Sequence, residues 1–344
     1  MSVLIDMAEA GKFPDSVVRL GIRRLLGQRL RDESRGDVQD QGSRYQRLVE
    51  ELRSSRIALD TQLANDQHYE LPAEFFRAVL GKRLKYSSGY WERGASNLDE
   101  AEEQMLALYA ERGELSDGQR ILDLGCGWGS FSLWAAQQFP NADITALSNS
   151  SGQREFILSQ AEARGLTNVR VITGDINHLQ IDDSFDRVVS IEMFEHMRNY
   201  ALLMNRIESW LNPGGKLLVH IFCHRNLLYP FSSTGHNNWM GRYFFTSGLM
   251  PAADTLLYFQ DDLRIEQRWM VSGTNYQKTA AAWLANLDSR EGEVRELMAR
   301  SYSDELADTW TERWRMFFMA CEELFGYRQG QEWLVCHYRF GRRD

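Results

Sequence analysis

The clearest hydrophobic pattern in the chain is a series of short apolar runs in its middle part. Five runs rich in β-branched residues, separated by polar or helix-like stretches, predict buried strands. They cover residues 120–125, 142–147, 168–173, 185–191 and 216–222. Helices are predicted between them at residues 131–139, 153–164 and 200–210. Buried strands that alternate with helices predict a parallel sheet covered on both faces.

Two long aromatic-rich segments interrupt this pattern in the C-terminal part. Strands predicted at residues 263–271 and 332–340 bring the sheet to seven strands, and each follows one such segment. The segments cover about residues 223–262 and 276–330. Aromatic side chains build apolar cores and also wall binding pockets. We therefore expect one α/β domain over residues 76–344, with two insertions that form a lid or substrate pocket.

Residues 1–75 are expected to form a helical N-terminal region. Residues 17–30 carry apolar side chains at helical spacing with arginines between them, and a second helix is expected over residues 47–60 after a polar loop at 37–46. A basic amphipathic helix can lie on a membrane surface. The acidic residues that follow from Asp32 instead favour an arginine-coated helix packed on its own protein.

Composition and charge narrow the class of protein. The net charge of −9 over 344 residues opposes a general affinity for nucleic acid or anionic lipid. No apolar run approaches a membrane span, and Asp6 and Glu9 argue against a signal peptide. The four cysteines lack the spacing of a zinc site or a disulfide framework, so no metal is predicted. We expect a cytoplasmic protein that neither binds nucleic acid nor inserts stably into membranes, and these features are compatible with a homodimer.

A glycine loop, LDLGCGWGSF (122–131), joins the first predicted strand to a helix. Gly125, Gly127 and Gly129 allow a tight turn and the close approach of a ligand to the main chain. The spacing fits neither a phosphate loop nor a dinucleotide loop. Asp123, just before the first glycine, suits a cationic ligand. The pattern resembles the S-adenosylmethionine loop of Rossmann-like methyltransferases, and a glycine-rich turn without a ligand is the alternative.

The next two strand ends add candidate contacts for this donor, because ligands of open α/β sheets bind beyond the carboxyl ends of the strands. Asn149 and Gln153 follow the second strand, where many methyltransferases carry an acid for the ribose hydroxyls. Asp175 and Ile176 follow the third strand and are expected to grip adenine, with the carboxylate on the exocyclic amine. A helix cap is the alternative role for Asp175.

Three ionisable residues, Glu192, Glu195 and His196, follow the fourth strand. On a helical turn, positions i, i+3 and i+4 face one way, so all three are expected to face the cleft beside the donor's methyl group. Two close carboxylates raise the pKa of one of them, which yields a general base beside an anion that can hold a cation. Burial would lower the pKa of His196 and a carboxylate would raise it, from about 6.5. A rate increase between about pH 6 and 8 is expected.

Beyond these motifs, the chain resembles the cyclopropane fatty acid synthase superfamily of S-adenosylmethionine enzymes. Within it, the chain is most similar to the coclaurine N-methyltransferase branch, which methylates benzylisoquinoline amines. The similar segments are KYSSGYW (85–91), LDLGCGWGS (122–130), SIEMFEHMRNY (190–200), RYFFTSGLMP (242–251) and ELFGYRQGQEW (323–333). The resemblance implies a Rossmann-like class I methyltransferase fold with a mostly parallel seven-stranded sheet. It also implies donor contacts from Tyr86 and Ser87.

The two branches of this superfamily differ at readable positions. Cyclopropane synthases have a cysteine that lines a bicarbonate site where this chain has Ser88, and a glycine where it has Glu192. The other bicarbonate positions match Glu195, His220 and Tyr276, which makes the last two candidate catalytic residues as well. Ser88 argues against bicarbonate as a cofactor. In the N-methyltransferase branch, the residues that match the three ionisable groups named above hold and deprotonate the amine.

The resemblance and the acid–base residues together predict an S-adenosylmethionine-dependent N-methyltransferase of a small, aromatic or cyclic amine. Methylene transfer to an unsaturated acyl chain is one alternative, and it requires a long apolar channel. Methylation of another small nucleophile is a second alternative. A methyltransferase-like fold that only binds ligands is a third, which the complete set of acid–base residues disfavours.

Overall fold

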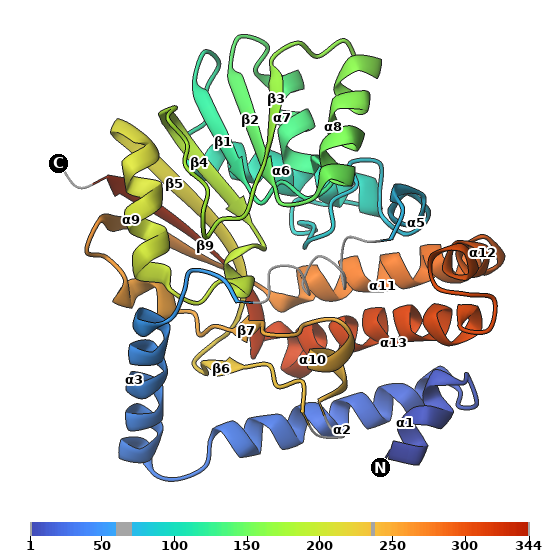
Figure 1. The fold of residues 1–344 in the computed structure, drawn as a ribbon. Helices are drawn as coiled ribbons and strands as arrows, with labels where there is room; N and C mark the ends of the chain where they lie inside the picture. Colours follow the sequence, from blue (N-terminus) through green and yellow to red (C-terminus); the bar gives the residue numbers. More distant parts are fainter. Residues whose placement is uncertain (1, 60–70, 235–237, 343–344) are drawn as a thin grey trace.

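A seven-stranded sheet forms the centre of the molecule (Figure 1), and the computed structural model describes residues 2–59, 71–234 and 238–342. Its strands are β1 (Arg120–Leu124), β2 (Asp143–Ser148), β3 (Val169–Thr173), β4 (Phe185–Ile191), β5 (Leu211–His224), β8 (Leu263–Val271) and β9 (Trp333–Arg342). Their order is β3-β2-β1-β4-β5-β9-β8. The first five strands are parallel, and β9 runs antiparallel to β5 and β8. The predicted mostly parallel seven-stranded sheet is confirmed.

Helices cover both faces of this sheet, because each central strand presents apolar side chains to both sides. The helices are α6 (Leu98–Gly113), α7 (Ser130–Gln138), α8 (Ser151–Ala163) and α9 (Tyr200–Trp210). Ile121 of β1 packs with residues of α6 and α7. Its neighbour Leu122 points the other way and packs with α9. Side chains of α7 and α8 such as Leu133 and Ile157 pack over Ala146 of β2.

The strand β5 begins earlier than its pattern predicts. It starts at Leu211, so the NPGG segment (212–215) belongs to the strand instead of preceding it. Gly214 there has φ +72°, and the pairing with β4 shifts between Phe185 and Arg187. The NPGG sequence, which usually marks a turn, thus forms an irregular first part of a long strand.

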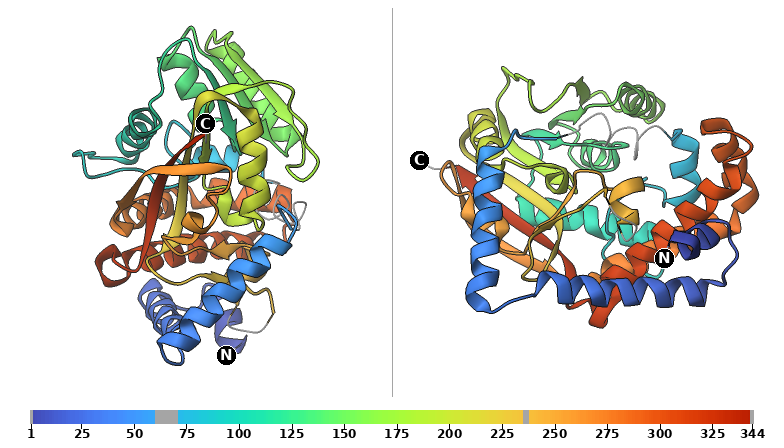
Figure 2. Two further views of the ribbon diagram at one scale, coloured as in Figure 1. Left: turned by 90° about the vertical axis from the view of Figure 1, so that its left-hand side faces the viewer. Right: turned by 60° about the horizontal axis from the view of Figure 1, so that its bottom comes forward.

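The N-terminal helices α1 (Ser2–Glu9), α2 (Asp15–Glu33) and α3 (Val38–Ser54) form an L along the base of the molecule (Figure 2). The loop predicted at residues 37–46 is wrong, because most of it lies in α3. The side chain of Asp37 accepts a hydrogen bond from Asp40 N, and the Asp40 side chain accepts one from Asp37 N. This reciprocal cap starts the helix, and Val49 and Leu52 anchor it in the core.

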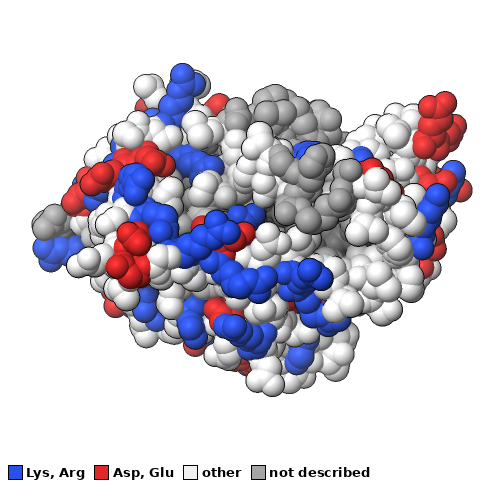
Figure 3. All heavy atoms as spheres, turned by 90° about the horizontal axis from the view of Figure 1, so that it is seen from below, with Lys and Arg blue, Asp and Glu red and all other residues white. Residues whose placement is uncertain are grey.

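Ion pairs tie these helices to the rest of the protein. The cationic side chains seen from below form a band across the base (Figure 3). On α2, Arg19 pairs with Glu322 at 2.7 Å and with Glu323 at 3.1 Å. Arg315 pairs with Asp15 at 3.1 Å. An arginine-coated helix packed on its own protein is therefore confirmed, whereas the boundary at residue 75 stays a prediction. Within the described residues, no helix combines the length and apolar character needed to span a bilayer.

The two insertions lie below the sheet in Figure 1. The first contains a two-stranded ribbon of β6 (Tyr229–Pro230) and β7 (Leu249–Met250), with α10 (Trp239–Tyr243) between them. The second consists mainly of α11 (Gly273–Ser289), α12 (Glu291–Ser301) and α13 (Ala307–Gly326). The described residues also form the short helices α5 (Ala73–Val79), η1 (Phe194–His196), η2 (Thr255–Tyr258) and η3 (Tyr327–Gly330). All four cysteines are buried free thiols.

Candidate functional site

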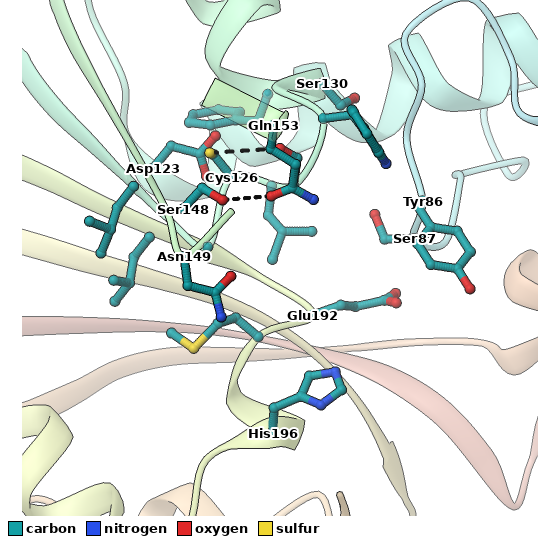
Figure 4. Close-up of a pocket in the computed structure, with 18 of the residues that line it drawn as sticks. Tyr86, Ser87, Asp123, Cys126, Ser130, Ser148, Asn149, Gln153, Glu192 and His196 are labelled. Atoms are coloured by element: carbon teal, nitrogen blue, oxygen red, sulfur yellow. Dashed lines mark hydrogen bonds between the residues drawn. The ribbon is translucent and has the colours of Figure 1, made fainter. Parts of the chain in front are cut away.

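The glycine loop after β1 forms one wall of a cavity at the carboxyl ends of the parallel strands (Figure 4). Gly125, Gly127 and Gly129 have φ values of +86°, +50° and +77°. A β-carbon on Gly125 would lie 2.7 Å from Met193 Cγ, and one on Gly129 would lie 2.7 Å from Ile157 Cγ1. A β-carbon on Gly127 would meet no heavy atom within 4 Å. The space beside Gly127 is therefore open to a ligand.

Eight of the nine residues predicted to contact the donor line this cavity of about 160 Å³. They are Tyr86, Ser87, Asp123, Gly125, Gly127, Asn149, Gln153 and Ile176. The exception is Asp175, whose Oδ1 accepts hydrogen bonds from Asn177 N at 2.8 Å and Asn177 Nδ2 at 3.0 Å. Asp175 thus closes a turn at residues 176–178 and is not the helix cap that was its alternative role, because no helix begins there. Only its neighbours Gly174 and Ile176 reach the cavity wall.

Two polar groups on the wall of the cavity fit S-adenosylmethionine. Asp123 is 1% exposed, and its Oδ2 accepts a hydrogen bond from Ser132 Oγ at 2.5 Å. Within the described residues, Asp123 Oδ1 and Gln153 Nε2 are buried without a hydrogen-bond partner. Burial raises the pKa of Asp123 to about 7. Because buried polar groups in native proteins are normally paired, these atoms fit a ligand that carries a cationic amine and hydroxyl groups.

Glu192 stands between this cavity and a second one. Its side chain is 10% exposed. Oε1 accepts a hydrogen bond from Ser88 N at 3.0 Å and lies 3.0 Å from His220 Nε2. Oε2 accepts a hydrogen bond from the hydroxyl of Tyr276 at 2.7 Å. A loop, a strand and the helix α11 thus each supply one donor to a single carboxylate.

This arrangement places the Glu192 carboxylate among residues that the family resemblance assigns to a bicarbonate site. Ser88 contributes its backbone N–H, and His220 and Tyr276 contribute their side chains. A carboxylate has the charge and the acceptor oxygens of bicarbonate, so the chain supplies its own anion at this position. The residues present therefore do not fit bicarbonate as a cofactor.

Glu195 lies away from both cavities. It is fully buried, and its Oε1 accepts a hydrogen bond from Phe222 N at 2.7 Å. The prediction that three ionisable side chains share one face is wrong, because Glu192 has φ +48° and the helical turn begins only at Phe194. Burial, together with the nearby Glu192, raises the pKa of Glu195 well above its usual range. Its neutral form is therefore favoured.

His196 lines both cavities beside Glu192, and its ring stacks on Phe245 at a centroid distance of 4.8 Å. Burial lowers the pKa of His196 to about 4, and the opposing effect of Glu192 is smaller. The imidazole is therefore neutral at pH 7. Titration of His196 does not explain a rate increase between about pH 6 and 8, which leaves the ionisation of the substrate amine as the expected cause.

The second cavity has a volume of about 80 Å³, half that of the first. Glu192 and His196 belong to its wall, and most of the other lining side chains are apolar. The predicted insertions supply many of them, including Phe231, Phe245, Trp283, Phe317, Leu324 and Phe325. Within the described residues this space is a short aromatic box and not a long channel.

Lys85 contributes to the site although it was not among the residues predicted from the sequence. Lys85 is 1% exposed, and its Nζ donates hydrogen bonds to Ser88 O at 2.8 Å and Ser87 Oγ at 2.5 Å. Burial lowers its pKa to about 8, which Glu192 partly opposes. The sequence offered one signal for this residue, a lysine at the start of KYSSGYW (85–91), a motif otherwise made of aromatic and small residues. Lys85 places a buried positive charge near the Glu192 carboxylate.

Comparison with known proteins shows similarity over nearly the whole chain. Residues 59–334 match the family model of mycolic acid cyclopropane synthetase. The chain is 35% identical to (S)-coclaurine N-methyltransferase of Thalictrum flavum subsp. glaucum, over 99% of this chain and 95% of that protein. It is 27% identical to cyclopropane-fatty-acyl-phospholipid synthase of Escherichia coli (strain K12), over 80% of this chain and 68% of the synthase. A crystal structure of coclaurine N-methyltransferase bound to N-methylheliamine and S-adenosylhomocysteine superposes with a TM-score of 0.94, at 35% identity and 98% coverage of both chains.

Proposed function

The chain belongs to the mycolic acid cyclopropane synthetase family, and from this premise we propose that it is an S-adenosylmethionine-dependent N-methyltransferase of small aromatic or cyclic amines. One observation carries the proposal. The Glu192 carboxylate lies among the residues that the resemblance assigns to the bicarbonate site of cyclopropane synthases. It belongs to the walls of both the donor cavity and the aromatic box. The similarity to an N-methyltransferase over 95% of that protein's length supports it.

Glu192 is proposed to hold the substrate as an ammonium ion, the form that predominates for most amines at neutral pH. Its three hydrogen-bond donors keep the carboxylate oriented, and Lys85 favours its ionised form. Burial strengthens the attraction between carboxylate and ammonium, because the local dielectric constant is low. An amide at this position would keep the shape of the site but lose the charge.

His196 is proposed to accept the ammonium proton on a ring nitrogen, which restores the lone pair of the amine. The neutral imidazole that burial favours is the form able to do this. Glu192 then stabilises the imidazolium that forms. S-adenosylmethionine, when bound, supplies an electrophilic methyl group. The chain's own contribution is alignment of the amine, removal of its proton and exclusion of water.

The aromatic box is proposed to select small cyclic amines. Phe245 and Trp283 line this cavity, and aromatic rings attract a cation. The wall of this cavity is mainly aromatic and apolar with the Glu192 carboxylate at one side, which suits a small cationic ring system. The geometry therefore favours methylation of an amine over cyclopropane formation.

The remaining roles belong to the same proposal. Of the residues that line the first cavity, the eight predicted donor contacts hold the donor, and His220 and Tyr276 hold Glu192 in place. The proposal describes a cytoplasmic enzyme with a small-molecule substrate and no nucleic-acid partner. A homodimer stays a prediction that light scattering tests.

The test is a methyl-transfer assay with purified protein and a donor carrying a labelled methyl group. A panel of cyclic secondary and tertiary amines that bear an aromatic ring should be methylated at the same rate with and without added bicarbonate. Vesicles of unsaturated phospholipid should gain no methylene groups. Methylene insertion into vesicle lipids, with no amine methylated across the panel, would reverse the assignment. Glu192→Gln serves as the control for chemistry at the proposed site.

A further inference from the structure

A line of polar side chains runs from Glu192 away from both cavities toward the surface. His220 Nε2 lies 3.0 Å from Glu192 Oε1, and His220 Nδ1 lies 2.9 Å from His337 Nε2. His337 Nδ1 in turn lies 2.8 Å from Nη1 of the half-buried Arg112. The two histidines are 1% and 0% exposed. In the described part of the chain, neither His337 nor Arg112 lines either cavity.

The chemistry of arginine determines the direction of every hydrogen bond in this line. A guanidinium only donates, so His337 Nδ1 must accept and carries no proton. Burial lowers the pKa of both histidines well below the usual range, and the charge of Arg112 lowers it further. Each ring therefore holds one proton. In His337 that proton is on Nε2 and is donated to His220 Nδ1, so the proton of His220 is on Nε2 and is donated to Glu192.

Tyr109 agrees with this assignment. Its hydroxyl lies 2.9 Å from the same His220 Nδ1. A hydroxyl can donate to an unprotonated nitrogen, and burial raises the pKa of Tyr109 well above its usual range, so the hydroxyl keeps its proton. Both neighbours of His220 Nδ1 can thus donate, and they share the single lone pair of that nitrogen. Arg112 differs from Tyr109 because a guanidinium cannot reverse its role. The ionised Glu192 carboxylate, which only accepts, requires the same direction at the other end, and Arg112 disfavours the reversed line that a protonated Glu192 would allow.

We propose that Arg112 and His337 are positioning residues, which fix the tautomer of His220 and so keep the Glu192 carboxylate oriented and ionised for a cationic substrate. The inference rests on the proposed role of Glu192. Arg112 acts on Glu192 indirectly. It donates to His337, His337 donates to His220, and His220 donates to the carboxylate. A charge at the protein surface thereby stabilises a charge in the active site.

The charge state of Glu192 is a balance of opposing influences. Burial raises its pKa, and the nearby cation Lys85 and the donors Tyr276 and Ser88 N lower it. The titratable groups around Glu192 come from six parts of the chain. They are Lys85, Tyr109, Glu195, His196, His220, Tyr276 and Cys321. Loss of the hydrogen bond from His220 would remove one contact that stabilises the ionised carboxylate. The effect of burial would then be less opposed, so the pKa of Glu192 would rise.

The first experiment observes the tautomers directly, by nitrogen-15 NMR of protein labelled at histidine. The signals of His220 and His337 are assigned by their loss in H220Q and H337Q. In the wild type, both rings should show the Nε2–H tautomer. Arg112→Met should give a mixture at His337, whereas Arg112→Lys keeps a donor and should preserve the wild-type pattern. An Nδ1–H tautomer or an imidazolium at His337 in the wild type would overturn the proposal.

The matched control is Arg339→Met. The Arg339 guanidinium lies 5.8 Å from the centroid of the Trp269 ring, the same ring over which Arg112 lies at 5.0 Å. The charged partners of Arg339 are Glu114 at 2.6 Å and Glu266 at 2.7 Å. Its Nη1 also donates a hydrogen bond to the backbone oxygen of Arg112 at 3.2 Å, but the Arg339 side chain is hydrogen-bonded to neither histidine of the line. Loss of a surface cation alone would affect both variants alike. Only Arg112→Met should change the histidine spectra.

The second experiment measures the effect on Glu192 with a permanently charged probe, a small aromatic quaternary ammonium ion that cannot titrate. Its affinity should fall as pH decreases through the pKa of Glu192. Arg112→Met should move this midpoint upward by about one pH unit, the expected effect of losing one hydrogen bond to a charged group. Arg112→Lys should largely restore it. An unchanged midpoint in Arg112→Met would overturn the proposal. If the probe binds at no pH and no amine is methylated, the proposed function fails, and the tautomer spectra still decide the inference.

Discussion

Substitution of Gly127 separates binding of the donor from stability of the fold. Gly127 lines the first cavity, and a β-carbon there meets no protein atom within 4 Å. An added side chain therefore occupies space available to the ligand and not space filled by the core. We expect Gly127→Ala to weaken binding of S-adenosylhomocysteine, and Gly127→Val to abolish it.

The expected magnitudes follow from the backbone and from packing. A non-glycine residue at φ +50° costs about 1–2 kcal/mol of folding stability. A side chain that overfills the contact between residue 127 and the bound ligand costs about 1–3 kcal/mol of binding free energy. This corresponds to a loss of affinity of roughly 5- to 150-fold. Gly118 provides the control, because it has φ +81° and also open space around its β-carbon, yet it does not line the cavity. Gly118→Ala should lose similar stability and no affinity.

The measurement combines calorimetric titration with S-adenosylhomocysteine and denaturant unfolding of the three variants, Gly127→Ala, Gly127→Val and Gly118→Ala. A folded Gly127→Val protein with wild-type affinity would refute the assignment of this cavity to the donor. Equal losses of affinity in Gly127→Ala and Gly118→Ala would show that backbone strain, and not occupied space, is responsible.

The remaining predictions concern four ionisable side chains of the site. Because burial raises the pKa of Asp123 to about 7 and a bound cation favours its ionised form, donor affinity should increase with pH up to about 7 and level off above it. Calorimetry in two buffers should detect proton release below pH 7, and Asp123→Asn should remove it. Glu192→Gln should raise KM for the amine more than it lowers kcat, and the opposite split would exclude an anchoring role. His196→Ala should lower kcat at pH 7 by about 100-fold, with partial recovery at high pH. Since the pKa of His196 is about 4, the midpoint of the wild-type pH profile should follow the pKa of the amine across the panel, and a constant midpoint would contradict this. Glu195→Gln should retain turnover within a few-fold, because the amide resembles the protonated acid that burial favours.

Local sequence determined most of the α/β core. The strands follow from apolar runs of β-branched residues, and the turn after β1 follows from three glycines within five positions. Such patterns act between neighbours in the chain, so they can be recognised without knowledge of the fold. The same local view failed at residues 37–46, where the exposed first half of α3 is polar. Its helical state depends on the Asp37–Asp40 cap and on Val49 and Leu52, which pack against distant residues.

The sequence by itself also identified the residue types of the site and most of the donor cavity, because these residues follow strand ends that a parallel sheet brings together. Only the tertiary structure decided what Glu192 does. Its positive φ turns the carboxylate away from Glu195, and its donors Ser88, His220 and Tyr276 are 104, 28 and 84 residues away along the chain. The sequence also left the sign of the pKa shift of His196 open. Depth of burial settled it, because the cost of moving a charge out of water depends on every atom packed around it and not on sequence neighbours.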